Sequence, residues 1–415
     1  MNDVLLKAGR LFDGQSESSL AEAYVHVRDG AIVAVGQQRE LEGAGGAGGS
    51  ERFERVLDFG PEATLLPGLI NMHVHMSFTS GTDLVGDHQR ESLQGKVIRS
   101  VENLKLALST GVTTVRDCGT LNEVAFPVRA AVESGLLTAP RVVAAGAGVT
   151  TTGGHCWFCC IEADGELEVR RAVRSQVKAG ADFIKLFSTG GNSTPGTNPL
   201  EAQYSEAEMC AATEEARRLG LRTASHAHGT PGVHASIAAR VTTVEHCTFL
   251  TADGMAYEPE QARIMAGEGM FVCPTIFQGV GKFASLGDPD LTPGQRGFLT
   301  VQQGRFGLTN KLMDAGVRIV SGSDAGVAHN TFDDYPGDLV LAVDGMGASP
   351  ATILKSATSV AAEALGRDDL GVLAPGKAAD LLAVRGDVLE DIRALLHPLG
   401  VMARGRLVHD YRGEG

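Results

Sequence analysis

Residues 66–75 read Leu66-Pro67-Gly68-Leu69-Ile70-Asn71-Met72-His73-Val74-His75, and this stretch decides the fold. An apolar run opened by a Pro-Gly turn is typical of a buried β-strand. His73 and His75 stand at positions i and i+2, so on a strand both imidazoles project from the same side and can reach one metal ion. Taken alone, the pair is equally well explained as two polar residues that end a core strand. Other strand-like runs favour the metal, because each ends near a potential ligand: Lys185, His226, His246 and Asp324.

Downstream of this stretch, strand-like and helix-like segments alternate. After the first strand, further strands are expected over residues 112–115, 141–145, 182–187, 221–226, 242–246, 270–275 and 317–322. Helices are expected over 94–110 and 166–179, and Ser205 with Glu208 forms a capping box that opens another helix. Eight strands joined by crossovers are typical of a closed parallel barrel. We therefore expect an α/β fold with a (β/α)8 TIM barrel over residues 66–365.

The two ends of the chain show short strands broken by turns instead. Strands are expected over residues 4–8, 24–28 and 31–35, with Asp29-Gly30 as a hairpin turn, and over 380–384 and 401–408. The sequence therefore predicts that residues 1–65 and 366–415 combine into one small β-sandwich domain beside the barrel.

Composition limits the partners of this protein. The 415 residues carry a net charge of −14 without a cluster of lysine or arginine, which argues against nucleic acid and anionic membranes. No apolar run reaches the ~18 residues of a membrane span. The N-terminus lacks the basic start and apolar core of a signal peptide, and seven cysteines, an odd number, suit reduced thiols. We expect a cytoplasmic protein, a homo-oligomer, with a small-molecule substrate.

The strand ends bring chemistry-bearing side chains together. In a (β/α)8 barrel the C-terminal ends of the strands meet on one open face. Imidazole and carboxylate ligands together suit Zn²⁺ or a similar divalent ion. Lys185 is the exception, since an ammonium repels cations. A carbamate formed from CO2 would turn Lys185 into an anion able to bridge two metals, whereas a lysine that reaches past the strand end to solvent is the simpler alternative.

These motifs resemble the amidohydrolase superfamily over essentially the whole chain. The likeness is greatest to its imidazolonepropionase-related branch, which includes Xaa-Pro dipeptidases and other metal-dependent carboxypeptidases. The residues that carry the resemblance are the stretch at 66–75, Thr152-Gly153-Gly154-His155, Phe183-Ile184-Lys185, His226-Ala227-His228-Gly229, Val244-Glu245-His246, Gly322-Ser323-Asp324-Ala325-Gly326 and residues 371–381.

The resemblance implies a site with two divalent metals, with Zn²⁺ expected. Asp324 would take a proton from a hydroxide-forming water between the metals and pass it to the leaving nitrogen. Asn71 departs from the family, which often has Asp there, so a supporting contact is in doubt. The implied ligands are His73, His75 and Asp324 for the more buried metal, His226 and His246 for the other, and carbamylated Lys185 with a hydroxide as bridges.

Four further residues are candidates for substrate contact. His155 and His228 are expected to bind the substrate and to assist catalysis, with a structural turn or a supporting role as alternatives. Arg116 could bind a substrate carboxylate or form an internal ion pair with Asp117. Trp157, between Cys156 and Phe158, is expected in an apolar wall of the pocket rather than beside a zinc held by the nearby cysteines.

The expected activity is hydrolysis of an amide-type C–N bond in a dipeptide or an N-acyl amino acid. Alternatives are an aryl amide, carbamate or urea hydrolase, and a cyclic-amide hydrolase or deaminase. Deaminase relatives usually use one metal and lack the lysine that stands at position 185. A non-enzymatic scaffold is a further alternative, which the full set of ligand types disfavours.

Overall fold

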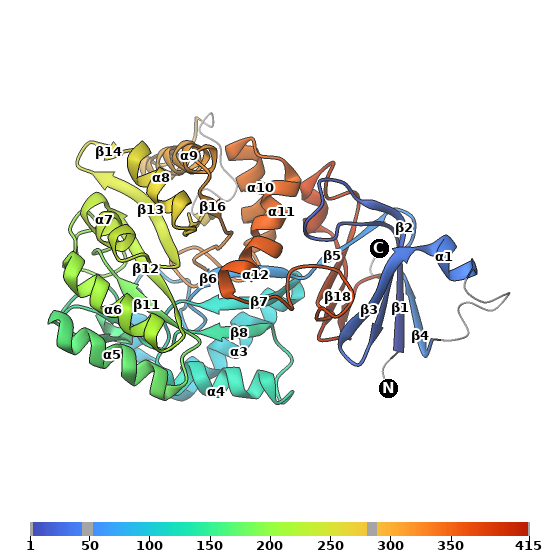
Figure 1. Ribbon diagram of the computed structural model, residues 1–415, viewed down its shortest axis with the longest axis horizontal. Coiled ribbons are helices and arrows are strands. Elements are labelled where there is room, and N and C mark those ends of the chain that lie inside the picture. The colour runs from blue at the N-terminus through green and yellow to red at the C-terminus, as the bar shows by residue number, and fades with distance from the viewer. Residues whose placement is uncertain (1–2, 44–52, 280–288, 414–415) are drawn as a thin grey trace.

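The chain has a mixed α/β fold, which the computed structural model describes over residues 3–43, 53–279 and 289–413. One sheet, at the right of Figure 1, combines strands from both ends of the chain. Its order is β19-β18-β17-β5-β1-β2-β3, and β4 also pairs with β1. Its strands are β1 (Asp3–Leu11), β2 (Leu20–Arg28), β3 (Ala31–Gln37), β4 (Arg55–Asp58), β5 (Ala63–Pro67), β17 (Leu381–Arg385), β18 (Pro398–Ala403) and β19 (Arg406–Asp410).

The meeting of the two chain ends in this sheet agrees with the sequence. The strand β5 lies between the N-terminal β1 and the C-terminal β17, with Leu66 opposite Leu382. The predicted hairpin is present, because Asp29 (φ 49°) and Gly30 (φ 85°) both have the positive φ that a tight turn between β2 and β3 requires. The strands are hydrogen-bonded into one sheet, and the two stacked layers of a sandwich are not confirmed.

Two further sheets carry the strands of the predicted barrel. The smaller has the order β6-β7-β8, and the larger has the order β10-β9-β11-β12-β13-β15-β16 with β14 paired to β13. The strands are β6 (Leu69–Val74), β7 (Val112–Asp117), β8 (Arg141–Ala144), β9 (Gly148–Thr150), β10 (Cys160–Glu162), β11 (Phe183–Phe187), β12 (Arg222–Gly229), β13 (Thr243–Thr251), β14 (Gly254–Met255), β15 (Phe271–Cys273) and β16 (Arg318–Ile319).

A few hydrogen bonds join the edges of these two sheets where the strand pairing ends. On one side the Asp182 N–H donates to the Ala144 carbonyl (2.9 Å). On the other the Met72 N–H donates to the Ser321 carbonyl (3.0 Å), and Val74 forms a lone bridge with Ala325. The described strands therefore form two sheets rather than one continuous closed ladder, and of the predicted fold class the mixed α/β part is shown.

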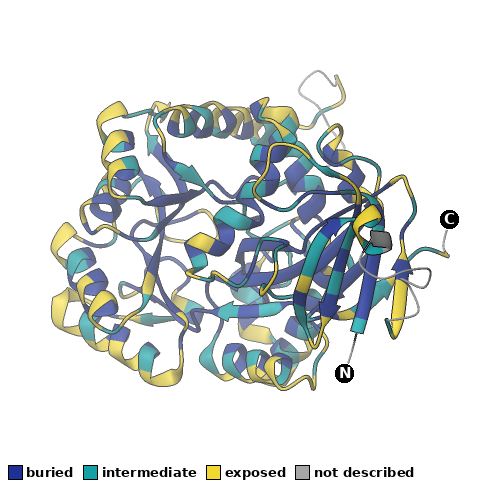
Figure 2. Ribbon diagram, turned by 45° about the vertical axis from the view of Figure 1, so that its right-hand side comes forward, coloured by how far each residue is buried: buried dark blue, intermediate teal, exposed yellow. Residues whose placement is uncertain are grey.

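Helices cover the outer faces of these sheets, as Figure 1 shows for α5 to α8 beside β11, β12 and β13. In Figure 2 the strands are largely buried and the outward helix faces exposed. The predicted capping box of Ser205 and Glu208 starts α6. No described helix is long and apolar enough to cross a membrane. The helices are α1 (Gln38–Gly43), α2 (Leu84–Arg90), α3 (Leu93–Ser109), α4 (Asn122–Glu133), α5 (Gly165–Ala179), α6 (Glu206–Arg218), α7 (Thr230–Ala238), α8 (Pro259–Gly267), α9 (Pro293–Asp314), α10 (Tyr335–Met346), α11 (Pro350–Ser356) and α12 (Ser359–Leu365), with 3-10 turns η1 (Trp157–Cys159) and η3 (Ile392–Leu396).

The stretch at 66–75 differs from its prediction in one respect, because it belongs to two strands. Pro67 ends β5 in the terminal sheet, and Leu69 begins β6 in the sheet that carries His73. Gly68 lies at the crossing, where a Cβ atom would come within 2.2 Å of the Thr113 side chain. The Thr113 side chain therefore occupies the space that any side chain at residue 68 would need, which favours glycine there.

Candidate active site

One group of ligand atoms forms where β6 and the segment after β16 end. His73 and His75 project together, as predicted, and Asp324 faces both: its Oδ1 lies 3.5 Å from His73 Nε2 and 3.4 Å from His75 Nε2. The Asp324 N–H donates to the His73 carbonyl (2.8 Å), which holds the loop against the strand. These three residues therefore meet as the sequence predicted.

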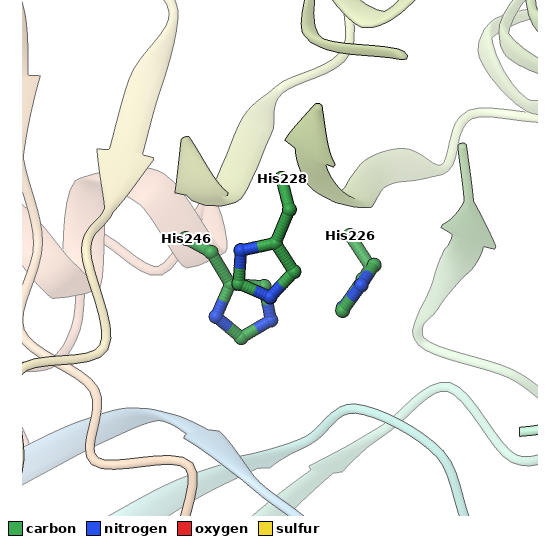
Figure 3. Close-up of side chains that lie close together, drawn as sticks. All are labelled: His226, His228 and His246. Atoms are coloured by element: carbon green, nitrogen blue, oxygen red, sulfur yellow. The ribbon is translucent and has the colours of Figure 1, made fainter. Parts of the chain in front are cut away.

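A second group comes from the neighbouring strands β12 and β13. The ligand nitrogens of His226, His228 and His246 lie within 4.8 Å of one another, and Figure 3 shows the three rings converging. His246 also belongs to a group with His73 and Asp324 in which the ligand atoms lie within the same distance. The two groups therefore share His246 and form one continuous centre.

Hydrogen bonds behind two of the rings determine which nitrogen carries the proton. His73 Nδ1 lies 2.8 Å from Glu245, whose carboxylate can only accept. His246 Nδ1 lies 2.7 Å from Thr275 Oγ1, and that hydroxyl already donates its hydrogen to the Pro274 carbonyl. Both rings must therefore donate through Nδ1. Their Nε2 lone pairs remain free for a cation.

Backbone carbonyls bind two other rings in the same way. His75 Nδ1 donates to the Gly119 carbonyl, and His226 Nε2 donates to the Gly190 carbonyl, each over 3.2 Å. Since a carbonyl can only accept, the ring nitrogen that faces it carries the proton, and in a neutral ring the opposite nitrogen keeps its lone pair. The sequence predicted five ligands besides Lys185. Four of them are histidines that these hydrogen bonds orient, and the fifth is Asp324.

His228 follows the same rule, although the sequence favoured it as a substrate contact. Its Nδ1 lies 3.1 Å from Thr248 Oγ1, and that hydroxyl donates to the His228 carbonyl. Nε2 is therefore unprotonated, and the ring stacks on His246 with centroids 4.5 Å apart. By position and protonation His228 could contact either a metal or the substrate.

Burial keeps four of these imidazoles neutral. It lowers the pKa of His73 to about 4 and that of His228 to about 3. It also lowers the pKa values of His226 and His246 well below the ordinary range. Metal ions bind neutral imidazole, so the rings are in the form that a cation needs. The pKa of Asp324 lies below its ordinary range although burial would raise it, so this carboxylate is charged.

Glu245 supports the centre, although no role was predicted for it from the sequence. Its side chain is fully buried, and Arg116 Nη2 donates to it over 2.6 Å. Burial would raise the pKa of Glu245, but Arg116 and His73 lower it below its ordinary range. A charged Glu245 holds the proton of His73 on Nδ1 and so orients the ring.

Arg116 itself lies inside the fold and not on the wall of the cavity described below. Besides Glu245, its guanidinium donates to the Met72 carbonyl (2.6 Å) and to Thr243 Oγ1 (2.8 Å). The structure thus favours the internal ion pair over the substrate contact, although the partner is Glu245 and not the predicted Asp117.

Asn71 provides a supporting contact where the family often has Asp. Its Oδ1 accepts from the backbone N–H groups of His73 (3.2 Å) and Ser323 (3.1 Å), and its Nδ2 donates to the Ser323 hydroxyl (2.7 Å). The amide therefore ties the His73 strand to the residue before Asp324. No ligand is lost through this departure.

Lys185 on β11 provides a test of whether a metal centre fits these residues. Its side chain is 1% exposed, and its Nζ has no hydrogen-bond partner among the described residues. An isolated buried ammonium is costly, so a group that supplies negative charge at Nζ would stabilise the fold. The donor set and this unpartnered nitrogen both fit the metals and the carbamate that the sequence implied.

Three residues at the centre have backbone conformations that side chains usually avoid. His246 (φ 66°), Thr275 (φ 48°) and Asp324 (φ 62°) all lie in the left-handed region. Such conformations are strained in residues other than glycine and persist where surrounding contacts impose them. The strain falls on two proposed ligands and on the partner of one of them.

The centre opens into a cavity of about 190 Å³. Its lining includes the predicted His155 and His228 but not Trp157, which is 36% exposed, while the neighbouring Phe158 lines the wall. Arg305, which the sequence did not single out, lies on this wall as well. The other lining residues are His75, Phe78, Leu84, Cys156, Phe187, Asn192, Ser193, His226, His246, Phe277, Asp324, Val327 and Ala328.

His155 stands over the centre on the loop after β9. Its ring centroid lies 4.6 Å from that of His226, and its backbone N–H donates to Gln203 Oε1 (2.6 Å). The ring nitrogen Nδ1 is buried without a partner among the described residues. His155 therefore lines the cavity beside the proposed ligand His226.

The combination of a mixed α/β fold with imidazoles and a carboxylate at the strand ends is that of a metal-dependent hydrolase class. Residues 64–408 match the Amidohydrolase family, and the chain belongs to this family. Members are hydrolases that act on C–N bonds and typically bind metal.

Individual relatives agree with this membership. Ochratoxinase from Aspergillus niger is 28% identical over 434 residues, which cover 96% of this chain and 84% of that protein. A solved Xaa-Pro dipeptidase with methionine in its active site has a TM-score of 0.82 and 29% identity, covering 98% of this chain and 100% of the other. Imidazolonepropionase from Salinispora tropica is 31% identical over 167 residues, 39% of this chain and 36% of that protein.

Proposed function

We propose that this protein is a binuclear metal-dependent hydrolase that cleaves the amide bond of a small dipeptide or N-acyl amino acid. The observation that carries the proposal is the convergence of histidine nitrogens and Asp324, together with an unpartnered Lys185 whose charge acts on them. The similarity to a Xaa-Pro dipeptidase supports a peptide-like substrate, and the similarity to ochratoxinase supports an amide with an apolar body.

The metals would be held by the residues that the sequence implied. His73, His75 and Asp324 would hold one, His226 and His246 the other, and both would share a carbamate on Lys185. The carbamate forms when the neutral Lys185 amine attacks CO2, which creates an N–C bond and releases one proton. When bound, two divalent cations such as Zn²⁺ polarise a carbonyl and make water more acidic.

The protein's own groups would then move protons and position the substrate. Asp324 accepts a proton from the attacking water and delivers it to the leaving nitrogen, as the C–O bond forms and the C–N bond breaks. His155 lines the cavity and would donate to the substrate carbonyl or carboxylate. His228 would assist from the other side, and Phe158 and Phe187 would exclude bulk water.

We also propose that the two inner sheets form one (β/α)8 barrel over residues 66–365, with residues 1–65 and 366–415 as a small second domain. The edge-to-edge hydrogen bonds of Ala144 and Ser321 support the closure.

A substrate screen together with metal analysis tests the function. We expect about two equivalents of metal per chain and turnover of dipeptides or N-acyl amino acids ahead of aryl amides, carbamates and ureas. Release of free ammonia from a cyclic or amino-substituted substrate, with one metal, would identify a deaminase instead. A metal-replete protein that cleaves none of these substrates would contradict the proposal.

A further inference from the structure

Arg305 brings a positive charge to the cavity wall from helix α9. Its Nη1 donates to the Thr275 carbonyl (3.1 Å) and lies 3.4 Å from Thr275 Oγ1. Its Nε is buried without a hydrogen-bond partner among the described residues. One side of the guanidinium is therefore fixed by Thr275, while the side formed by Nε and Nη2 has no partner in the part of the chain that the structure describes.

The charge of Arg305 is not balanced by a neighbouring carboxylate. None of the described residues places a carboxylate within salt-bridge distance of it, and its nearest titratable neighbours include the neutral His228 and His246. Asp324 acts on Arg305 only at longer range and faces His73 and His75 instead. Burial lowers the pKa of Arg305, but a guanidinium stays protonated in proteins. Arg305 is partly exposed on the cavity wall, and a cation there without a carboxylate neighbour attracts an anionic ligand.

We propose that Arg305 binds the carboxylate of the substrate. A guanidinium pairs with a carboxylate through charge-assisted hydrogen bonds, and Arg305 is a partly exposed cation on the cavity wall with no carboxylate partner among the described residues. This assignment rests on the proposed amide hydrolysis and makes Arg305 a residue that determines specificity. It replaces Arg116, which the sequence suggested for the same task.

The position of Arg305 also selects which carboxylate is bound. Thr275 Oγ1 accepts from His246 Nδ1 (2.7 Å) and is also contacted by Arg305 Nη1. Thr275 therefore connects a proposed metal ligand, His246, to the guanidinium of Arg305. A carboxylate at Arg305 must then lie close to the scissile bond. The substrate class is therefore N-acyl α-amino acids and dipeptides, whose carboxylate is one carbon from the scissile nitrogen, and not ureas or amides without an acid group.

Calorimetric binding to the metal-loaded protein tests the contact without turnover. The probes are L-methionine and L-methioninamide, and the variants are Arg305→Gln, Arg305→Lys and the control Arg296→Gln, which changes an exposed arginine on the same helix. We expect the wild type to bind methionine ~10- to 100-fold more tightly than the amide, as charged hydrogen bonds imply. Arg305→Gln should abolish this preference, Arg305→Lys should keep part of it, and Arg296→Gln all of it. An unchanged preference in folded Arg305→Gln, or no binding of methionine by the wild type, would overturn the assignment.

Kinetics separate this inference from the proposed function. N-acetyl-L-methionine and N-acetyl-L-methioninamide form a matched pair that differs only in the carboxylate. Arg305→Gln should lower kcat/KM for the acid by ~10- to 100-fold and for the amide by less than ~3-fold. Equal losses for both would refute the role of Arg305 while leaving amide hydrolysis intact. If no amide is cleaved but methionine binding still depends on Arg305, the proposed function fails and the carboxylate site stands.

Discussion

The two walls of the cavity differ in how their polar groups are satisfied. On the strand wall, His73, His75, His226 and His246 each donate one ring N–H to a fixed acceptor behind them. The substrate wall is our name for the lining that comes from the loop after β9 and from α9, and there His155 Nδ1 and Arg305 Nε have no partner among the described residues. Histidine rings that are held by hydrogen bonds from behind present lone pairs in fixed directions, and such a wall suits a metal. A wall with unused donors suits a substrate.

Lys185 is the exception on the strand wall, and its removal has the largest expected effect. We expect Lys185→Ala to lose bound metal and activity together, because the shared anion between the metals disappears. Metal analysis and turnover measured on the same preparation check this, with the exposed Lys178→Ala as a control that retains both. Bicarbonate should also speed the reconstitution of metal-free wild type. Full metal content in Lys185→Ala would contradict the carbamate.

Asp324→Asn should leave the metals bound but lower kcat by at least ~10²-fold, the range for losing general acid–base help. The amide still reaches His73 and His75 but cannot accept a proton from water. The measurement is kcat at matched metal content, with the exposed Asp333→Asn as a control. Near-normal turnover of the metal-replete variant would remove Asp324 from the mechanism.

His155→Ala and His228→Ala test where the boundary between the walls lies. Loss of one substrate hydrogen bond should raise KM or lower kcat by ~10-fold. If both residues serve the substrate, both variants keep two metals. Loss of metal in His228→Ala alone would move His228 to the strand wall, which its ring stacking on His246 allows.

The smallest expected effect is that of replacing His88, which packs behind aromatic residues of the cavity lining. It is 8% exposed, and its ring lies against Phe78 and Phe158. Burial lowers the pKa of His88 from 6.5 to about 4, so between these values the unfolded chain binds a proton that the folded chain does not. This contribution to stability is present above pH 6.5 and lost as the pH falls to about 4. His88→Phe should weaken the decline of the unfolding temperature over this window, and an unchanged decline would exclude His88 as a cause.

The strand wall was predictable from the sequence because strand geometry fixes side-chain direction. Alternation with period two places His73 and His75 on the same side without any knowledge of tertiary contacts. The loop wall lacks such a rule. Trp157 and Phe158 are adjacent in a 3-10 turn that follows Cys156 (φ 58°), and that local conformation sends Phe158 and not Trp157 to the cavity.

Other features depended on contacts between segments far apart in the sequence. Arg305 lies within an ordinary helical pattern, and only packing of α9 against Thr275 brings it to the cavity. Arg116 forms its ion pair with Glu245, and not with its sequence neighbour Asp117, because β7 and β13 face each other across the interior. The division of residues 66–75 at Gly68 was missed as well, since an apolar run does not reveal that it changes sheets.

The pairing of β5 with β17 has a consequence for the synthesis of the protein. All six predicted ligands precede residue 325, whereas β17 begins only at Leu381. A growing chain therefore contains every ligand while β5, one residue ahead of the strand that carries His73, still has an unpaired edge. Exposed edges of this kind pair readily with other chains. Chains released before residue 381 would thus aggregate although they contain every ligand. Translation of the final strands is therefore what protects the protein from aggregation.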